Sequence, residues 1–187
     1  TDLLVKHLLS VKSDWDPAIS GNYASTFVVA SDNEVFTNLF ASIGILSKSE
    51  LATERIFVAL DNKDQEDEHS CFSDNTYQDI VLNAKGIQNV YLGSYKRVDG
   101  TVVSGSSLYQ LLAEKDYDLA EKIKNLCAES VAKAEAIPQP FDYALTLENT
   151  GGNGPIMQTV NSLQSLGDEL AKGAAALGLT INTELPE

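Results

Sequence analysis

The sequence has few of the residue types that support covalent cross-linking, metal binding or nucleophilic catalysis. It contains two cysteines and two histidines in 187 residues. Two cysteines cannot build a disulfide scaffold, so Cys71 and Cys127 either pair once in an oxidising compartment or remain small buried side chains. No His-Glu-x-x-His motif and no glycine-rich phosphate loop is present. These absences exclude the helix of a classical zinc protease and leave nucleotide binding without support.

Basic residues and long apolar runs are scarce as well. There are 13 lysines and arginines against 27 aspartates and glutamates, which gives a net charge of −14. This balance argues against nucleic acid as a partner and against an anionic membrane surface. No apolar run reaches the roughly 18 residues of a membrane-spanning helix. The chain begins without Met, inside a helical pattern, which we interpret as a processed or truncated chain, so the missing signal peptide says nothing about its compartment.

Helical periodicity accounts for most of the sequence. Apolar residues recur every three or four positions in stripes that begin with Leu4, Leu8, Val11 and Trp15, the spacing of amphipathic helices. Further stripes cover 35–46, 47–60, 77–95, 108–131 and 156–177. The segments between them are an expected loop at 18–31, a polar span at 61–73, the prolines at 138 and 140, and a glycine-rich loop at 150–155. We therefore expect one all-α domain over residues 1–187, an antiparallel bundle of five to seven helices.

Local signals refine this expectation. Asp32 is a plausible N-cap, as is Ser73 or Asp74 for the helix that follows the polar span, and Ser106 or Ser107 for a later one. The Asp-Gly pair within Val98–Val103 predicts at most one short β-hairpin.

The most informative stretch is Asp64–Thr76, which reads DQEDEHSCFSDNT. It is too polar for a core and lacks the Lys/Glu alternation of an ordinary solvated helix. Such a run either caps helices in a complex way or forms a site. Its carboxylates and imidazole suit iron or another hard or borderline cation. It is not an EF-hand loop, because the sixth position from Asp61 holds Glu66 where that loop requires glycine.

Two further groups have a structural and a functional interpretation. Glu50 and Glu54 lie four residues apart on one expected helix face, where like charges repel unless a cation such as Arg55 lies between them. The group is therefore either an ion pair between helices or part of a pocket. Ser70 follows His69, but adjacent residues rarely face each other and no strand-turn-helix elbow is present. A serine nucleophile is therefore disfavoured, and so is Cys71 as a nucleophile.

Three segments in this order, 49–55, 64–76 and 83–93, resemble the imelysin family. That family comprises imelysin-like proteins of the bacterial envelope, which are classed as iron-regulated proteins or as metallopeptidases. The later AIPQPFD segment at 136–142 and the leucine-rich end resemble it too. The resemblance implies an all-helical protein built of bundle-like halves, of which this chain corresponds to the C-terminal half. The family's Gly-x-His-x-x-Glu signature is absent, because Ser10 and Phe72 stand three places after His7 and His69.

The resemblance also gives the expected site. It implies ligand binding by Glu54, Arg55, Asp67, Ser70 and Asp74, with His69 as a metal ligand. The expected function is that of an envelope protein implicated in iron uptake or in metal or ligand binding, non-catalytic as this fragment. The alternative is a metallopeptidase whose metal site needs the N-terminal half.

The expected partners follow from the same resemblance. They are the N-terminal half of the same protein, against which helix 1–16 packs, and a metal or a haem- or iron-linked ligand. Iron or another divalent metal is the expected cofactor of the full-length protein. The expected location is the periplasm, the outer membrane or the cell surface.

Overall fold

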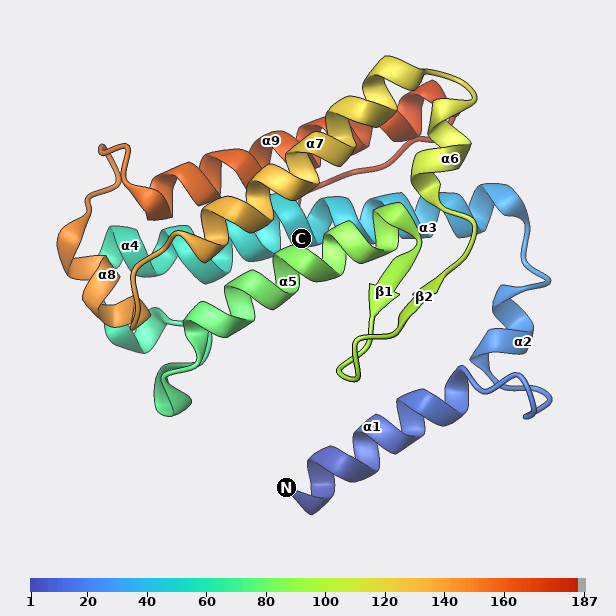
Figure 1. Ribbon diagram of the computed structural model, residues 1–187, viewed down its shortest axis with the longest axis horizontal. Helices are drawn as coiled ribbons and strands as arrows, with labels where there is room; N and C mark the ends of the chain where they lie inside the picture. Colours follow the sequence, from blue (N-terminus) through green and yellow to red (C-terminus); the bar gives the residue numbers. More distant parts are fainter. Residues whose placement is uncertain (185–187) are drawn as a thin grey trace.

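Four long helical segments form an antiparallel bundle in the computed structural model, which describes residues 1–184 (Figure 1). The first runs without a break from Asp32 to Asn62, and the chain then reverses at each long helix in turn. The other three are α5 (Thr76–Leu92), α7 (Tyr117–Glu135) and α9 (Pro155–Ala176). The all-α prediction is confirmed; residues 185–187 of the expected domain lie outside the described part.

The apolar stripes face one shared core. Helix α9 packs against α7 and against the first long segment, and α5 packs against α7. The fully buried side chains come from all four segments: Phe40, Leu51, Ile56, Ile80, Ile87, Tyr91, Ile123, Leu163 and Leu170. Buried polar atoms inside the bundle have partners, as polar groups in a low-dielectric interior require. The Tyr91 hydroxyl donates to the Ala120 carbonyl at 3.1 Å, and the Ser47 hydroxyl donates to the Leu163 carbonyl at 2.7 Å.

The first long segment changes its winding along its length. It consists of α3 (Asp32–Ile45), a π-helical stretch η1 (Leu46–Phe57) and α4 (Val58–Asn62). The separate stripe expected over 47–60 does not start a new helix: the serines at its beginning, Ser47 and Ser49, use their hydroxyls in tertiary hydrogen bonds and cap no helix. A π-helix closes its hydrogen bonds five residues apart, is rare, and is enriched at functional sites.

Short helices account for the remaining differences from the expected elements. Helix α2 (Tyr23–Phe27) lies in the expected loop, and α8 (Phe141–Leu147) follows the proline break. The helices α1 (Asp2–Asp14) and α6 (Leu108–Ala113) complete the set. When Asp32–Asn62 is counted once, residues 1–184 contain eight α-helical segments, one above the expected range.

The helix caps also differ in part from expectation. Ser31, not Asp32, caps α3 by accepting from the Glu34 amide at 3.3 Å. The N-cap position of α5 is Asn75 rather than Ser73 or Asp74. Ser107 is confirmed as the N-cap of α6, where it forms a capping box with Gln110.

A single hairpin interrupts the helices. Strands β1 (Ser94–Lys96) and β2 (Val102–Ser104) pair antiparallel, with Ser94 opposite Ser104. The Asp-Gly turn is where the sequence placed it, but the strands extend outside 98–103. Gly93 sets where α5 ends: its φ is +58°, and a Cβ there would lie 2.7 Å from the Ser106 carbonyl oxygen.

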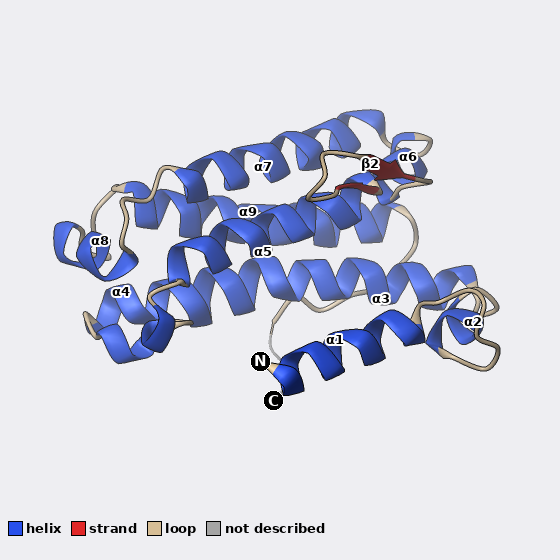
Figure 2. Cartoon of the chain, turned by 60° about the horizontal axis from the view of Figure 1, so that its bottom comes forward, coloured by secondary structure: helices blue, strands red, loops and turns tan. Residues whose placement is uncertain are grey.

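Helix α1 (Asp2–Asp14) lies clear of the bundle in Figure 1 and on the α3 side of it in Figure 2, and it buries none of its residues. It is joined to α2 by an aromatic cluster in which Trp15 contacts Tyr23 and Phe27, with ring centroids 5.0 and 5.3 Å apart. No helix among residues 1–184 is both long and apolar enough to cross a membrane.

Candidate functional site

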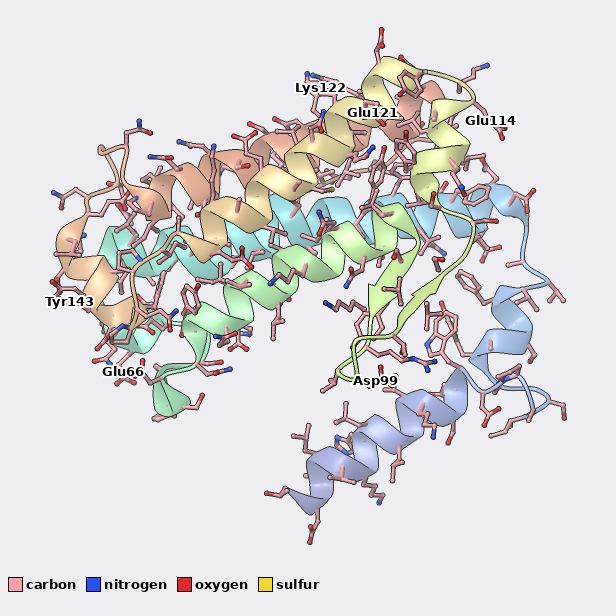
Figure 3. The ribbon with its side chains drawn as sticks, in the orientation of Figure 1. Glu66, Asp99, Glu114, Glu121, Lys122 and Tyr143 are labelled. Atoms are coloured by element: carbon pink, nitrogen blue, oxygen red, sulfur yellow. The ribbon has the colours of Figure 1, made fainter. Side chains whose placement is uncertain are left out.

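The polar segment forms a loop, 63–75, that crosses one end of the bundle between α4 and α5. Lys63 ends α4 in a left-handed conformation with φ of 55°, and its Nζ donates to the Leu145 carbonyl of α8 at 2.5 Å. Within the loop, η2 (Gln65–Asp67) and η3 (Cys71–Ser73) are short 3₁₀ turns. Figure 3 shows Glu66 of this loop and Tyr143 of α8 at the same end of the molecule. The loop is therefore held against α8.

Polar side chains from the loop converge on the carboxylate of Asp79, in the first turns of α5. Ser70 Oγ donates to Asp79 Oδ2, and Asn75 Nδ2 donates to Asp79 Oδ1 at 3.2 Å. His69 Nδ1 lies 3.8 Å from Asp79 Oδ2. We call these four residues the Asp79 cluster. The Ser70 amide is fixed as well, because it donates to the buried Thr76 hydroxyl at 3.2 Å.

The imidazole of His69 lies beside the Asp79 carboxylate without a hydrogen bond to it. The 3.8 Å between His69 Nδ1 and Asp79 Oδ2 is longer than a hydrogen bond, so the carboxylate acts on the ring through its charge alone. The His69 side chain is 35% exposed, and no hydrogen bond within residues 1–184 involves its Nε2. In histidines that bind metals, the other ring nitrogen donates to a carboxylate; Asp79 lies on the side of the His69 ring where such a partner would be needed.

Glu68 is the loop's buried acid. It is 5% exposed, and its Oε1 has no hydrogen-bond partner. Burial raises the pKa of the Glu68 carboxyl above its ordinary 4.5, the nearby charges of Asp142 and Asp74 raise it further, and a hydrogen bond with Thr76 opposes them. An unpaired buried polar atom costs about 1–3 kcal/mol, so the loop retains this group at the expense of stability.

Glu54 and Arg55 lie on a different element, η1. Arg55 Nη2 contacts Glu50 Oε2 at 3.0 Å, an ion pair between residues five apart that the wide π-helical turn brings to one side. The expected cation for the glutamates is thus Arg55, but only Glu50 uses it, and Glu54 is exposed. Among residues 1–184, no hydrogen bond or ion pair joins Glu54 or Arg55 to the Asp79 cluster.

The remaining expected site residues lie along the loop. Asp67 accepts from Asn62 Nδ2 at 2.7 Å, which ties the loop back to α4. Asp74 ends η3 in a left-handed conformation with φ of 50°, and its charge reaches Glu68. The structure therefore brings His69 and Ser70 to one carboxylate, that of Asp79, and links Asp74 to them only through the loop.

The geometry limits the chemistry of the site. Ser70 bonds to Asp79 rather than to His69, so the loop contains no Ser–His nucleophile pair. Cys71 and Cys127 are both free thiols. Cys127 is buried in α7, where burial raises its thiol pKa to about 12 and leaves it unreactive at neutral pH. Residues 1–184 contain no group of three His, Cys, Asp or Glu side chains placed to hold a metal ion.

Comparison with known proteins places the chain in a family. The family model described as imelysin (Peptidase_M75) matches residues 1–170. The chain belongs to the imelysin family. Iron-regulated protein A of Synechococcus elongatus is 29% identical to it over 126 residues, which make up 67% of this chain and 34% of that protein.

A solved imelysin has the same fold. The crystal structure of an imelysin peptidase from Bacteroides ovatus superposes with a TM-score of 0.62 at 22% identity, covering 90% of this chain and 49% of that one. At this identity the likeness shows the fold alone. The chain therefore spans between a third and half of the length of these imelysin relatives.

Sequence reasoning missed the roles of two residues at this end of the bundle. Asp79 lies beside both His69 and Ser70, and Glu68, one acid of the polar run, is buried. A signal for Asp79 was present, because the helix dipole favours an acid in the first turn of a helix. Nothing in the sequence distinguished Glu68 from the exposed acids around it.

Proposed function

We propose that this imelysin-family chain is a binding protein of the bacterial envelope with an iron-linked role, and that loop 63–75 with Asp79 forms its binding surface. The observation that carries the proposal is the Asp79 cluster. In it the Asp79 carboxylate lies beside Nδ1 of His69, and Nε2 of the same imidazole is available to a ligand. The name of Iron-regulated protein A supports the link to iron. Family resemblance supports an extracytoplasmic location, in the periplasm or at the outer membrane.

Among the residues present, His69 can supply one ligand to a metal ion. Imidazole suits iron and other borderline divalent cations, and carboxylates suit them as hard donors. His69 would supply Nε2, and Asp79 would hold the ring in place from the opposite side. Asp67, Asp74, Ser70, Glu54 and Arg55 are the proposed polar contacts for the rest of a ligand. Because residues 1–184 hold no complete metal group, the other ligands come from the metal's own partners or from a further segment of an imelysin.

A binding role accounts for the site better than catalysis by this chain. A metallopeptidase needs a metal held by about three protein ligands and a neighbouring base that activates water. The described residues provide neither in one place. Peptidase activity of a longer imelysin remains the alternative, and the same experiment distinguishes the two.

The two histidines provide a matched test. Fe²⁺, supplied anaerobically, is titrated into the protein and binding is followed by calorimetry. His69→Ala is expected to lower the affinity at least about tenfold, the effect of losing a metal ligand, and Asp79→Asn is expected to weaken binding by about 10- to 100-fold, the usual effect of removing the group behind a ligand. His7→Ala, in exposed α1, is expected to bind as the parent does.

Three results would contradict this proposal. Equal Fe²⁺ affinity in His69→Ala and the parent would remove His69 from the site. No Fe²⁺ binding by the parent would remove the metal. Peptide hydrolysis by the chain alone, abolished by a chelator, would replace binding with catalysis.

A further inference from the structure

Helix α1 carries more exposed apolar surface than a free helix can support. Six of its large side chains and its C-cap residue, Trp15, are between 49% and 63% exposed: Leu3, Leu4, Val5, Leu8, Leu9, Val11 and Trp15. The helix has only 13 residues and none is buried. Helices of this length are marginal in water and depend on packing of an apolar face. Exposed apolar surface of this kind marks an interaction site.

Four of these residues form a regular seam. Leu4, Leu8, Val11 and Trp15 follow one another at intervals of four, three and four. This is the a/d spacing of a coiled coil, in which two helices bury a narrow stripe against each other. Leu9 lies about 130° around the helix from the centre of this seam, at 3.6 residues per turn. The α1 seam thus has an on-seam and an off-seam leucine side by side.

We propose that the α1 seam binds the α1 seam of a second copy of this chain, with the two helices antiparallel. In this register Leu8 lies opposite the second copy's Val11, and Leu4 lies opposite the second copy's Trp15. A two-fold axis at the centre of the seam makes each contact occur twice, as a self-complementary interface requires. The large Trp15 ring then meets a leucine at each end, whereas a parallel pair would place two tryptophans against each other.

The residues that flank the seam favour the same orientation. His7 and Asp14 lie on one side of it, and Val5 and Lys12 lie on the other. In the antiparallel pair, His7 lies beside the second copy's Asp14, so an imidazole N–H can donate to a carboxylate twice per dimer. The aliphatic stem of Lys12 lies along the second copy's Val5. A parallel pair would place His7 beside Lys12, which offers no acceptor.

The aromatic cluster fixes one end of the seam in advance. Trp15 is held by Tyr23 and Phe27, yet half of it remains exposed. A rigid, half-exposed indole is typical of a residue that anchors an interface. One short helix per partner is at the small end of protein interfaces, so we expect a dimer with a dissociation constant in the micromolar range.

Sedimentation equilibrium between about 1 and 200 μM tests the proposal, with Trp15 fluorescence as a second reading because it is the only tryptophan. The parent is expected to dimerise, with a blue shift of emission as concentration rises. Leu8→Asp is expected to raise the dissociation constant at least about a hundredfold, because each dimer loses two buried leucines. Leu9→Asp, off the seam, is expected to dimerise as the parent does.

Every other outcome overturns the proposal. A parent that is monomeric at all concentrations would assign the seam to a further segment of a longer imelysin chain. A dimer that survives Leu8→Asp would place the interface elsewhere, and equal loss in Leu9→Asp would show that α1 associates through unspecific apolar contact. Circular dichroism of each variant shows that the bundle is folded, since α1 contributes none of the core.

Discussion

Glu148 caps the N-terminus of α9. Its Oε2 and Oε1 accept from the amides of Ile156 and Met157 at 2.9 and 2.8 Å, and the residue is 8% exposed. Free amides and the helix dipole at an N-terminus both favour a carboxylate. Glu148→Ala is expected to lower the free energy of unfolding by about 2 kcal/mol, because two buried charge-assisted hydrogen bonds are lost. Urea denaturation measures this.

An exposed glutamate provides the control. Glu129 pairs with Lys133 one turn away on the surface of α7, where its side chain is 50% exposed. Glu129→Ala is expected to cost less than about 0.5 kcal/mol. A similar loss in both variants would mean that the capping bonds of Glu148 contribute no more than a surface ion pair.

At the same scale, the site shows which residue roles can be predicted from sequence. His69 and Ser70 were predicted together because they are neighbours in the polar run, and the structure joins them through Asp79. Glu54 and Arg55 were grouped with them by resemblance. Their contacts depend on the π-helical winding of η1, and no pattern of residues in the sequence predicted that winding. Burial of Glu68 could not be predicted either, because the acids of the polar run look alike in sequence and only the folded loop separates the buried one from the exposed ones.

Close helix crossings require small residues at particular positions. Gly167 of α9 faces η1, and a Cβ there would lie 2.6 Å from Lys48 Cβ, an atom that cannot rotate away. Gly167→Ala is therefore expected to destabilise the bundle by about 1–3 kcal/mol, the cost of overpacking. Gly86 of α5 has nothing within 4 Å of its Cβ position, so Gly86→Ala is expected to stabilise by about 0.5–1 kcal/mol. Opposite shifts of the urea midpoint confirm the contact, and a stabilising Gly167→Ala would contradict it.

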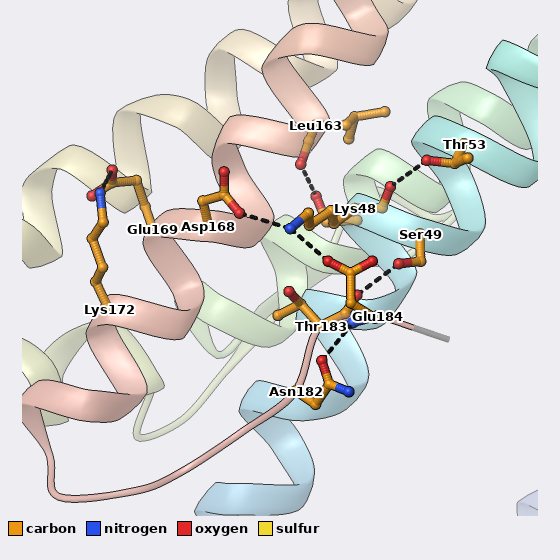
Figure 4. Close-up of polar contacts among 11 residues, drawn as sticks. Lys48, Ser49, Thr53, Leu163, Asp168, Glu169, Lys172, Asn182, Thr183 and Glu184 are labelled. Atoms are coloured by element: carbon orange, nitrogen blue, oxygen red, sulfur yellow. Dashed lines mark hydrogen bonds and ion pairs between the residues drawn. The ribbon is translucent and has the colours of Figure 1, made fainter. Parts of the chain in front are cut away.

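The C-terminal segment packs on the same crossing (Figure 4). Ser49 donates to the Thr183 carbonyl at 2.7 Å, and Lys48 bridges Asp168 and Glu184 at 3.1 and 2.8 Å. A Cβ on Gly44 would meet Thr183 Cγ2 at 2.8 Å. The first long helical segment therefore has small and polar residues, Gly44, Lys48 and Ser49, where the C-terminal segment packs on it.

Periodicity predicted the long elements and failed for the short ones. Stripes spanning several turns fix a helix, whereas α2 and α8 complete fewer than two turns and leave no repeat to detect. Helix α2 forms because Asn22 caps it and its aromatic residues pack on Trp15. The Asp-Gly turn predicted the hairpin, but the strand ends depend on Gly93 and its contact with the chain after β2.

For the whole molecule, the sequence predicted a helical bundle and its family, but could not predict what covers each face. A stripe shows that a helix face is apolar without showing its partner. The stripes of α5, α7 and α9 meet in one core, while that of α1 contacts the aromatic residues of α2 at its Trp15 end and buries none of its residues. The partner of a helix face depends on three-dimensional packing, which is why helix 1–16 was expected to pack against the N-terminal half of the protein and is here proposed to bind a second copy.

The excess of acidic groups sets how stability depends on pH. Burial and nearby acids raise the pKa of Glu68 above 4.5, so its unfavourable ionisation in the folded state is relieved as pH falls from neutrality through that raised value. Glu169 behaves in the opposite way. Burial alone would raise its pKa, but hydrogen bonds from Lys172 and Lys122 lower it below 4.5 overall. Its stabilisation is therefore present above 4.5 and is lost as pH falls through the lowered value.

The net charge of −14 adds self-repulsion at neutral pH, which weakens as carboxylates gain protons. The free energy of unfolding should therefore peak on the acidic side of neutrality and above about pH 4.5. In that range the buried Glu68 carboxyl gains its proton, while Glu169 is still ionised and holds its ion pairs with Lys122 and Lys172. Urea midpoints at half-unit steps from pH 4 to 8 locate this maximum. Glu68→Gln, which removes the buried charge, is expected to be more stable than the parent at pH 7 and to gain less on acidification. A parent whose stability peaks at or above pH 7 would show that neither Glu68 nor the net charge governs the profile.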